Sequence, residues 1–357
     1  MGGTEIHVAE IAKRMAARGH EVHVVCADGD DGTSNETIEG VRVTRVPSLT
    51  SSDLFVAPAM ANVVRRFDGD LLHVQGYHTF TAPIALAAGH AAELPTVLTF
   101  HSGGHDSSVR RFLRPLQRRG LRPLISRADH LIGVSHFESA FFARTLGLPL
   151  ERFSTIPNGT DFDRDLAGPD IVAAPEDNVV CSVGRLEKYK GHHRAIAALP
   201  ALRELVPDAH LEIIGTGPYE PELRALTMEL GVEDHVDFLS FPASDRAGLV
   251  RTLRRASLVV LLSDYESQGM TILEAMALGR PVLVSDTSAL GALARDHGAQ
   301  AVPTDIAPQG LAERIAGTLG MGDAAIPTSP DVHRWDEIAD RIERLYRRVL
   351  AGTPVRT

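Results

Sequence analysis

Residues 178–191 read NVVCSVGRLEKYKG, an apolar run followed by a charged loop. The apolar run is continuous rather than alternating, as in strands buried on both faces of a parallel sheet. Gly184 then predicts a tight turn, and Arg185 and Lys190 follow it five positions apart. This order places two cations at the carboxyl end of a buried strand, where open α/β sheets bind ligands.

The two cations suit a pyrophosphate, because a guanidinium offers a planar fork of donors and an ammonium a compact charge. Only three of the 36 basic residues are lysines, and Lys190 is one of them, which favours a specific role. The alternative is a pair of solvated cations in a surface loop. We expect phosphate binding at Arg185 and Lys190.

Similar apolar runs alternate with helical patterns along the rest of the chain, at 21–27, 41–47, 71–76, 96–102, 130–135, 153–159, 210–217, 236–241, 258–264, 281–286 and 299–303. Alternating strands and helices predict right-handed βαβ crossovers and an α/β fold. Residues 163–178 are rich in Asp, Pro, Ala and Gly and resemble a linker. The chain therefore predicts two doubly wound, Rossmann-like domains, 1–165 and 178–333, facing a ligand cleft.

Helical patterns stand at both ends of the chain. Segment 334–357 carries an amphipathic helix that we expect to pack back on the N-terminal domain. At the other end, Gly2-Gly3 opens a helix, whereas such a turn normally follows the first strand of a Rossmann unit. We therefore expect that the first strand of this domain is missing and that the natural start lies about 10–20 residues upstream.

The bulk composition limits the possible partners and compartments. A formal net charge of −10 argues against nucleic acid as the main partner. Cys26 and Cys181 lie in different predicted domains, which argues against a disulfide and fits a cytoplasmic protein. The first residues given lack the basic start and apolar centre of a signal peptide, and no apolar run reaches the ~18 residues that span a bilayer, so we expect a cytoplasmic protein.

A second cluster, DYESQGMTILEAMA, covers residues 264–277. Glu266 follows a predicted strand, a helix is expected to begin near Gly269, and Glu274 falls one to two turns into it. The free N–H groups at the helix start and the two carboxylates could bind phosphate oxygens and sugar hydroxyls. Equally, Glu266 could favour the helix dipole and Glu274 could be a buried, paired carboxylate.

Two further features lie in the first half. His101 ends a predicted buried strand, at the edge where ligands bind, although a lone histidine is more often structural. Residues 109–122 include six arginines and no acid, from Arg110 to Arg122. They form a solvated helix face, an acceptor site for an anionic group, or a patch that docks on acidic lipid at the inner face of the plasma membrane. Pro115 is expected to interrupt this helix. No residue set has metal-ligand spacing, so neither a metal nor a cofactor is expected.

Together these residues resemble the retaining glycosyltransferase family 4, of the GT-B fold. The motifs that carry the resemblance span nearly the whole chain: Gly2-Gly3-Thr4-Glu5, Arg18-Gly19-His20-Glu21-Val22, His101, Ile156-Pro157-Asn158-Gly159-Thr160-Asp161, Gly184-Arg185, Lys190-Gly191, Gly215-Thr216-Gly217-Pro218, and Glu266 with Glu274. The chain departs from the family where Ser267-Gln268 replaces Gly-Phe and where Ser240 replaces a Gly.

The resemblance implies roles for these residues. Arg185 and Lys190 would neutralise the donor diphosphate, and Glu266 would contact the donor sugar, opposite His101. Glu274 would bind the ribose and Gly2-Gly3 would approach the phosphates. The remaining implied donor-binding positions are Gly184, Gly215, Gly217, Ser267, Gln268, Gly269, Met270 and Thr271.

The implied reaction is the retaining, metal-independent transfer of a hexosyl or N-acetylhexosaminyl group from a UDP- or GDP-sugar. The acceptor would be a hydroxyl group of a saccharide, a lipid-linked sugar or a small metabolite. The alternatives are a sugar-nucleotide epimerase or a phosphorylase of the same fold, or a non-catalytic partner that binds nucleotide sugar.

Overall fold

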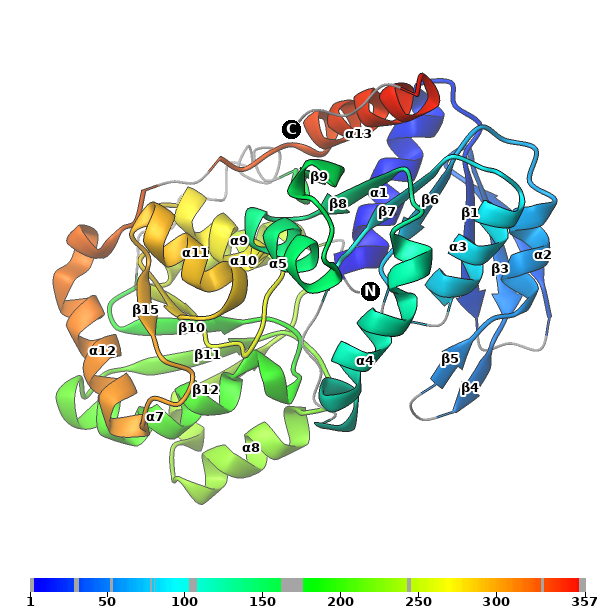
Figure 1. Ribbon diagram of the computed structural model, residues 1–357. Helices are drawn as coiled ribbons and strands as arrows, with labels where there is room; N and C mark the ends of the chain where they lie inside the picture. The colour runs from blue at the N-terminus through cyan, green and yellow to red at the C-terminus, as the bar shows by residue number, and fades with distance from the viewer. Residues whose placement is uncertain are drawn as a thin grey trace. The chain divides into compact units, whose positions relative to one another are not determined.

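A computed structural model describes residues 3–28, 32–51, 54–77, 79, 81–102, 108–161, 176–242, 245–328 and 331–352 (Figure 1). The chain forms two compact units. Unit 1 comprises Met1–Ser102, Val109–Thr160 and His333–Thr357, and unit 2 comprises Gly103–Ser108 and Asp161–Val332. Among the described helices, none is both long and apolar enough to cross a membrane.

Unit 2 is a six-stranded parallel sheet with helices packed against it (Figure 1). Its strands are β10 (Val179–Val183), β11 (His210–Ile214), β12 (Val236–Leu239), β13 (Leu258–Leu261), β14 (Val282–Ser285) and β15 (Gln300–Val302). The helices are α7 (His192–Leu205), α8 (Glu220–Glu229), α9 (Arg246–Arg255), α10 (Met270–Ala277), α11 (Ser288–His297) and α12 (Pro308–Met321).

The strand order in unit 2 is β12-β11-β10-β13-β14-β15, and every neighbouring pair is parallel. The chain therefore adds β11 and β12 on one side of β10, and then crosses over to add β13, β14 and β15 on the other side of β10. β10, β13 and β14 are buried along their whole length, as their continuous apolar runs predict. The point where the order reverses, between β10 and β13, is the position at which such sheets bind ligands.

Unit 1 contains a mixed three-stranded sheet, a parallel four-stranded sheet and a short hairpin. Strands β1 (His23–Asp28), β2 (Ser34–Ile38) and β3 (Val41–Pro47) pair in the order β1-β3-β2, with β2 antiparallel. Strands β6 (Leu72–Gln75), β7 (Thr96–Thr99), β8 (His130–Gly133) and β9 (Phe153–Thr155) form a separate parallel sheet, while β4 (Leu49–Ser51) pairs with β5 (Leu54–Val56).

The helices of unit 1 are α1 (Gly3–Ala17), α2 (Ala59–Arg65), α3 (Thr81–Ala91), α4 (Ser108–Ile125), α5 (His136–Leu146) and α13 (Trp335–Leu350). The expected α/β architecture with parallel sheets is confirmed. The expectation that Pro115 breaks its helix is wrong, because α4 runs without interruption through that position. β2, β4 and β5 were not predicted, since their sequences are short and polar or lie beside turn residues.

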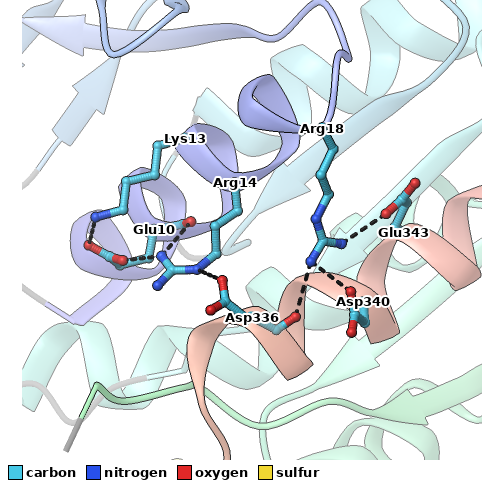
Figure 2. Close-up of polar contacts among 7 residues, drawn as sticks. All are labelled: Glu10, Lys13, Arg14, Arg18, Asp336, Asp340 and Glu343. Carbon is cyan, nitrogen blue, oxygen red and sulfur yellow. Dashed lines mark hydrogen bonds and ion pairs between the residues drawn. The ribbon is translucent and has the colours of Figure 1, made fainter. Parts of the chain in front are cut away.

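The C-terminal helix α13 packs on α1, which begins the described chain. Ile338, Ile342 and Leu345 share an apolar cluster with Ile11 and Met15 of α1. Figure 2 shows the polar rim of this contact: Arg14 pairs with Asp336 at 2.7 Å. Arg18 reaches Asp340 at 2.6 Å and Glu343 at 2.8 Å. Contacts between the amphipathic helix α13 and the basic face of α1 thus hold these two segments together within unit 1.

Candidate active site

The loops that follow β10 and β11 pack backbone against backbone. The amide of Leu186 donates to the carbonyl oxygen of Thr216 at 3.0 Å. A Cβ atom at Gly215 would collide with the carbonyl oxygen of Gly184, and one at Gly217 would collide with that of Leu186. Glycine is therefore required here for close approach, which holds the Gly184 turn at a fixed height above the sheet.

Lys190 and Glu266 lie on the two sides of the reversal point of unit 2. The Lys190 Nζ atom stands 2.6 Å from Glu266 Oε1, and the side chains are only 16% and 12% exposed. Ser263 Oγ donates to the same carboxylate oxygen at 2.7 Å, and the Glu266 amide donates to Ser288 Oγ at 2.8 Å. This semi-buried pair is held on several sides, so it presents a defined cation and a defined anion at the carboxyl edge of the sheet.

Arg185 differs from Lys190 in its freedom to move. Its guanidinium pairs with Glu187 at 2.6 Å, but its side chain is 61% exposed. An exposed pair of this kind contributes little to stability, so a stronger anionic ligand can displace it. Arg185 and Lys190 thus offer one mobile and one fixed positive charge after the same strand.

Helix α10 carries the second carboxylate of the predicted pair. Its cap, Gly269, has φ +78°, a left-handed conformation that favours glycine. Glu274 is buried in the helix and accepts a charge-assisted hydrogen bond from Arg246 at 2.7 Å. Gln268 is also buried, whereas Met270 and Thr271 are half-buried in the first turn. The structure thus shows Glu274 as a buried, paired carboxylate, and its binding of a sugar hydroxyl stays a prediction.

His192 begins α7 and was not singled out from the sequence. It is completely buried and joins Ser182 Oγ at 2.8 Å to the carbonyl oxygen of Arg185 at 3.2 Å. Burial lowers its pKa to about 4, so the ring is neutral near pH 7. A neutral ring has one N–H donor and one acceptor nitrogen, which matches a hydroxyl on one side and a carbonyl on the other. His192 therefore fixes the backbone from which Arg185 projects.

His101, in unit 1, lies two residues after Thr99, the last residue of β7. Its backbone has φ +34°, a left-handed conformation that is uncommon for a histidine. The ring is almost completely buried and its Nε2 atom donates to Gln75 Oε1 at 2.8 Å. Gln75 in turn contacts the half-buried His73, whose ring is hydrogen-bonded to Tyr346 Oη of α13 at 2.6 Å. A chain of neutral hydrogen bonds thus runs from α13 to His101.

Two more contacts fix the neighbourhood of His101. The adjacent Ser102 amide donates to the buried carboxylate of Glu138 at 2.8 Å, and burial raises the pKa of that carboxyl. The ring of His7 meets that of His101 edge-on, with centroids 4.6 Å apart, and bonds Asn158 Oδ1 at 2.9 Å. Strained backbone persists only where its surroundings over-determine it, as they do here.

Several residues that were predicted to bind the donor or the acceptor take no part in the contacts described above. Gly2 lies outside the described residues, while Gly3 is the exposed first residue of α1. The side chains of Arg110, Arg111 and Arg114 are likewise outside them. Within the rest of that arginine run, Arg118 stacks over the Phe141 ring and Arg122 donates to the Leu146 carbonyl oxygen at 2.6 Å. Those two arginines are therefore engaged with unit 1 itself.

Comparison with known proteins identifies the family of this chain. A model described as Glycosyltransferase Family 4 matches residues 1–164, and one described as Glycosyl transferases group 1 matches residues 164–325. The chain is 30% identical to the glycogen synthase of Mycobacterium tuberculosis, over 91% of this chain and 84% of that protein. The chain belongs to glycosyltransferase family 4.

Other relatives of this glycosyltransferase agree. It is 29% identical to a phosphatidyl-myo-inositol mannosyltransferase of Mycobacterium leprae, over 98% of this chain and 93% of the relative. Anabaena HepE, solved in complex with UDP, superposes with a TM-score of 0.73 at 22% identity, covering 97% of this chain and 96% of HepE. Sucrose-phosphate synthase from Thermosynechococcus elongatus gives 0.73 at 21% identity, covering 99% and 94%. The predicted GT-B fold and the prediction of a glycosyltransferase are confirmed.

The structure also shows residues that hydrogen-bond with the predicted site residues or their neighbours and that the sequence analysis did not single out: Gln75, Glu138, His192, Ser263 and Ser288. A signal for Gln75 was present, because it ends an apolar run just as His101 does. For Glu138 and His192, which lie at helix starts, the sequence offers no comparable pattern.

Proposed function

We propose that this enzyme transfers a hexosyl or N-acetylhexosaminyl group from a nucleotide sugar to an acceptor hydroxyl, with retention of anomeric configuration and without a metal ion. The observation that carries the proposal is the semi-buried Lys190–Glu266 pair at the reversal point of unit 2, with the exposed Arg185 beside it. A diphosphate matches the two cations, and a sugar hydroxyl matches the carboxylate.

Binding of the donor would change both of these ion pairs. The diphosphate takes over Arg185 from Glu187 and shares Lys190 with Glu266. Because Glu266 keeps its bond from Ser263, its carboxylate remains oriented toward a sugar hydroxyl. Glu274, already paired with Arg246, would accept from the ribose with its remaining lone pairs.

In the reaction, the bond between the anomeric carbon and the β-phosphate oxygen breaks while the acceptor oxygen bonds to the same face of that carbon. Negative charge grows on the leaving phosphate, where Lys190 and Arg185 stabilise it. The acceptor proton passes to a phosphate oxygen. The fixed Lys190 and the mobile Arg185 together supply the charge stabilisation that a divalent metal supplies in other enzymes, which supports a metal-free mechanism.

The donor is proposed to be a UDP- or GDP-sugar, and the UDP complex of the structurally similar HepE supports the first. The acceptor is proposed to be a saccharide, a lipid-linked sugar or a small metabolite, and the mannosyltransferase relatives favour a lipid-linked one. The cytoplasm is the proposed compartment, which the placement of Cys26 and Cys181 in different units supports. Peripheral contact with acidic lipid through Arg110–Arg122 belongs to the same proposal.

The first experiment measures thermal stabilisation by UDP-, GDP-, ADP- and dTDP-sugars, with and without EDTA. A ligand at 100 times its dissociation constant adds about 2.7 kcal/mol to the unfolding free energy, which is readily seen. We expect a shift with one nucleotide class, indifferent to EDTA, lost in Lys190→Ala and kept in Lys188→Ala. Stabilisation that requires a metal, or that survives Lys190→Ala, contradicts the proposed site. NMR of the product's anomeric proton then tests retention.

A further inference from the structure

Arg194, in the first turn of α7, spans the residues that follow β13. One of its guanidinium nitrogens donates to the carbonyl oxygen of Leu262, and another lies 2.6 Å from Asp264 Oδ1. The Arg194 side chain is 21% exposed, and that of Asp264 is 39% exposed. Between these two anchor points lies Ser263, whose hydroxyl donates to Glu266 at 2.7 Å. One guanidinium therefore holds the chain on both sides of a residue that orients the Glu266 carboxylate.

The turn ahead of α7 packs directly against the same segment. A Cβ atom at Gly191 would collide with the carbonyl oxygen of Leu262, so the close approach requires glycine. The Asp264 amide donates to the carbonyl oxygen of Tyr189 at 2.8 Å. Lys190 lies between Tyr189 and Gly191, so the backbone that carries this cation is held against the segment that follows β13.

The segment 262–269 belongs to neither a strand nor a helix. It therefore lacks the regular ladder of backbone hydrogen bonds that fixes β13 itself. The contacts of Glu266 with the Ser263 and Ser288 hydroxyls involve neutral donors or acceptors on the serine side. Both contacts of Arg194 use an ionised donor, and hydrogen bonds of that kind are roughly twice as strong as neutral ones. The guanidinium of Arg194 is therefore a strong determinant of the course of this segment.

The choice of arginine at this position has a chemical reason. A planar guanidinium offers N–H donors in a fixed fork, which can meet a backbone carbonyl and a carboxylate at once, whereas a lysine ammonium is a single point charge. The pairing also neutralises Asp264, which lies at the same edge of the sheet as Lys190 because β10 and β13 are parallel. An unpaired carboxylate at that edge would compete with Glu266 for Lys190 and would repel a diphosphate. Arg194 thus acts on both the geometry and the charge of this edge.

We propose that Arg194 is a positioning residue for sugar transfer: it fixes segment 262–264 and, through Ser263, holds the Glu266 carboxylate in place for the donor sugar. This inference rests on the proposed function, because it concerns the same donor site. Arg194 itself contacts neither the diphosphate nor the sugar. Its loss should therefore disturb the sugar contact of Glu266, while Arg185 and Lys190, which follow β10, still bind the diphosphate.

Hydrogen exchange of the free protein tests the positioning without any substrate. The variants are Arg194→Ala and the milder Asp264→Asn, which keeps an acceptor but loses the charge. Arg203→Ala is the matched control, because it removes a guanidinium from the last turn of the same helix, where Arg203 donates to the Ala209 carbonyl oxygen at 3.2 Å. We expect exchange in the peptide 262–269 to be at least about fivefold faster in Arg194→Ala, faster by a smaller factor in Asp264→Asn and unchanged in Arg203→Ala.

Kinetics then tests whether this position matters to the reaction. In Arg194→Ala we expect kcat to fall about 10–100-fold, while the dissociation constant of UDP or GDP, whichever the parent chain binds, changes less than about threefold. Arg194→Lys should stay within about threefold of Arg194→Ala in kcat, since one ammonium does not hold both acceptors. Guanidinium ion, added below the concentration that unfolds the parent chain, should raise the kcat of Arg194→Ala and leave that of Arg203→Ala unchanged.

Equal exchange in Arg194→Ala and Arg203→Ala overturns the proposal, as does faster exchange with a kcat equal to that of the parent. A parallel loss of nucleotide affinity and kcat in Arg194→Ala also overturns it, because Arg194 would then bind the donor directly. Should Arg194→Ala fail to fold, Asp264→Asn decides by the same criteria. If no nucleotide sugar stabilises the parent chain, the proposed function fails, while the exchange comparison still decides whether Arg194 fixes segment 262–264.

Discussion

The two units use the same kind of buried parallel strand, but their sheets differ in continuity. In unit 2, β10 and β13 pair directly at the reversal point, through Val180, Cys181 and Ser182. In unit 1, β1 and β6 belong to separate sheets, and a cavity of about 470 Å³ is lined by residues of both strands. Loops that rise from two paired strands are held at a fixed separation, which is what a close ion pair such as Lys190–Glu266 requires. Direct strand pairing thus explains why the charged machinery is assembled in unit 2.

The polar interiors of the units differ as well. Unit 2 holds its site with ion pairs, whereas unit 1 surrounds His101 with neutral hydrogen bonds from Gln75 and with buried histidines. Removing one partner of an ion pair that is little exposed is costly, because the other partner is left as an unpaired charge away from water. Neutral contacts orient a ring without adding charge. The two units should therefore respond differently to removal of a charge and to acid.

The largest expected effect is on turnover, from Lys190→Ala. Loss of one preorganised donor to a developing negative charge typically lowers turnover about 10²–10³-fold. Lys188→Ala removes the same charge from the same turn, where the side chain is exposed, and should change turnover less than about threefold. Steady-state kinetics with the donor identified by thermal shift checks both. Near-normal turnover in Lys190→Ala, or equal losses of turnover in the two variants, would show that Lys190 does not stabilise the leaving phosphate.

Acid should weaken unit 1 before unit 2. Burial lowers the pKa of His7 to about 4, of His73 to about 3 and of His130 to about 4, all in unit 1, against His192 alone at about 4 in unit 2. These pKa values lie below that of a histidine in the unfolded chain, so the unfolded state binds protons first. Stability is complete above pH 6.5 and is lost as the pH falls from 6.5 toward 4.

Each such histidine should cost about 2 kcal/mol of unfolding free energy at pH 5. The raised pKa of the Glu138 carboxyl acts in the opposite direction in unit 1, since its protonation restores stability as the pH falls. Three histidines outweigh one carboxyl. Hydrogen exchange at pH 7 and pH 5, resolved by peptide, should show protection lost first in β6–β8. Earlier loss in β10–β13 would reverse the comparison.

Gln75 provides a finer test of the neutral site. Gln75→Ala removes the acceptor for His101 Nε2, and we expect about a fivefold loss in kcat with little change in donor KM, because one hydrogen bond contributes about 1 kcal/mol. Gln75→Glu restores an acceptor but adds a charge that stabilises the imidazolium. It should recover kcat above neutral pH and lose it toward acid. If the pH profiles of Gln75→Glu and the parent coincide, Gln75 merely fills space.

The sequence predicted the parts of this molecule that follow from local patterns. The strands of unit 2, the turn at Gly184 and the helix that begins after Gly269 were all readable, because continuous apolar runs and punctuating glycines report burial and backbone conformation directly. The partner of Glu274 was not readable, since Arg246 lies 28 residues away and meets it only after α9 folds. Arginines are abundant here, and a sequence does not show which of them a carboxylate selects.

The smallest expected effect concerns the contact between α1 and α13. Hydrogen bonds from His20 and Arg18 lower the pKa of Glu343 to about 2, below that of a glutamate in the unfolded chain. The stabilisation is therefore present above about pH 4.5 and is lost as the pH falls toward 2. We expect Glu343→Gln to lower the unfolding midpoint at pH 7 by about 1–3 °C, since ion pairs at the surface of a protein contribute little even where they are half-buried.

Glu337→Gln is the matched control, because it removes the same charge from the same helix at a side chain that is 57% exposed and lies 3.2 Å from His333. It should leave the midpoint unchanged. The difference between the two variants should vanish near pH 2 and shrink in 1 M salt, where the screening length is about 3 Å. A difference that survives both conditions would show that Glu343 acts through packing on α1, and the charged rim in Figure 2 would then have no part in joining the ends of unit 1.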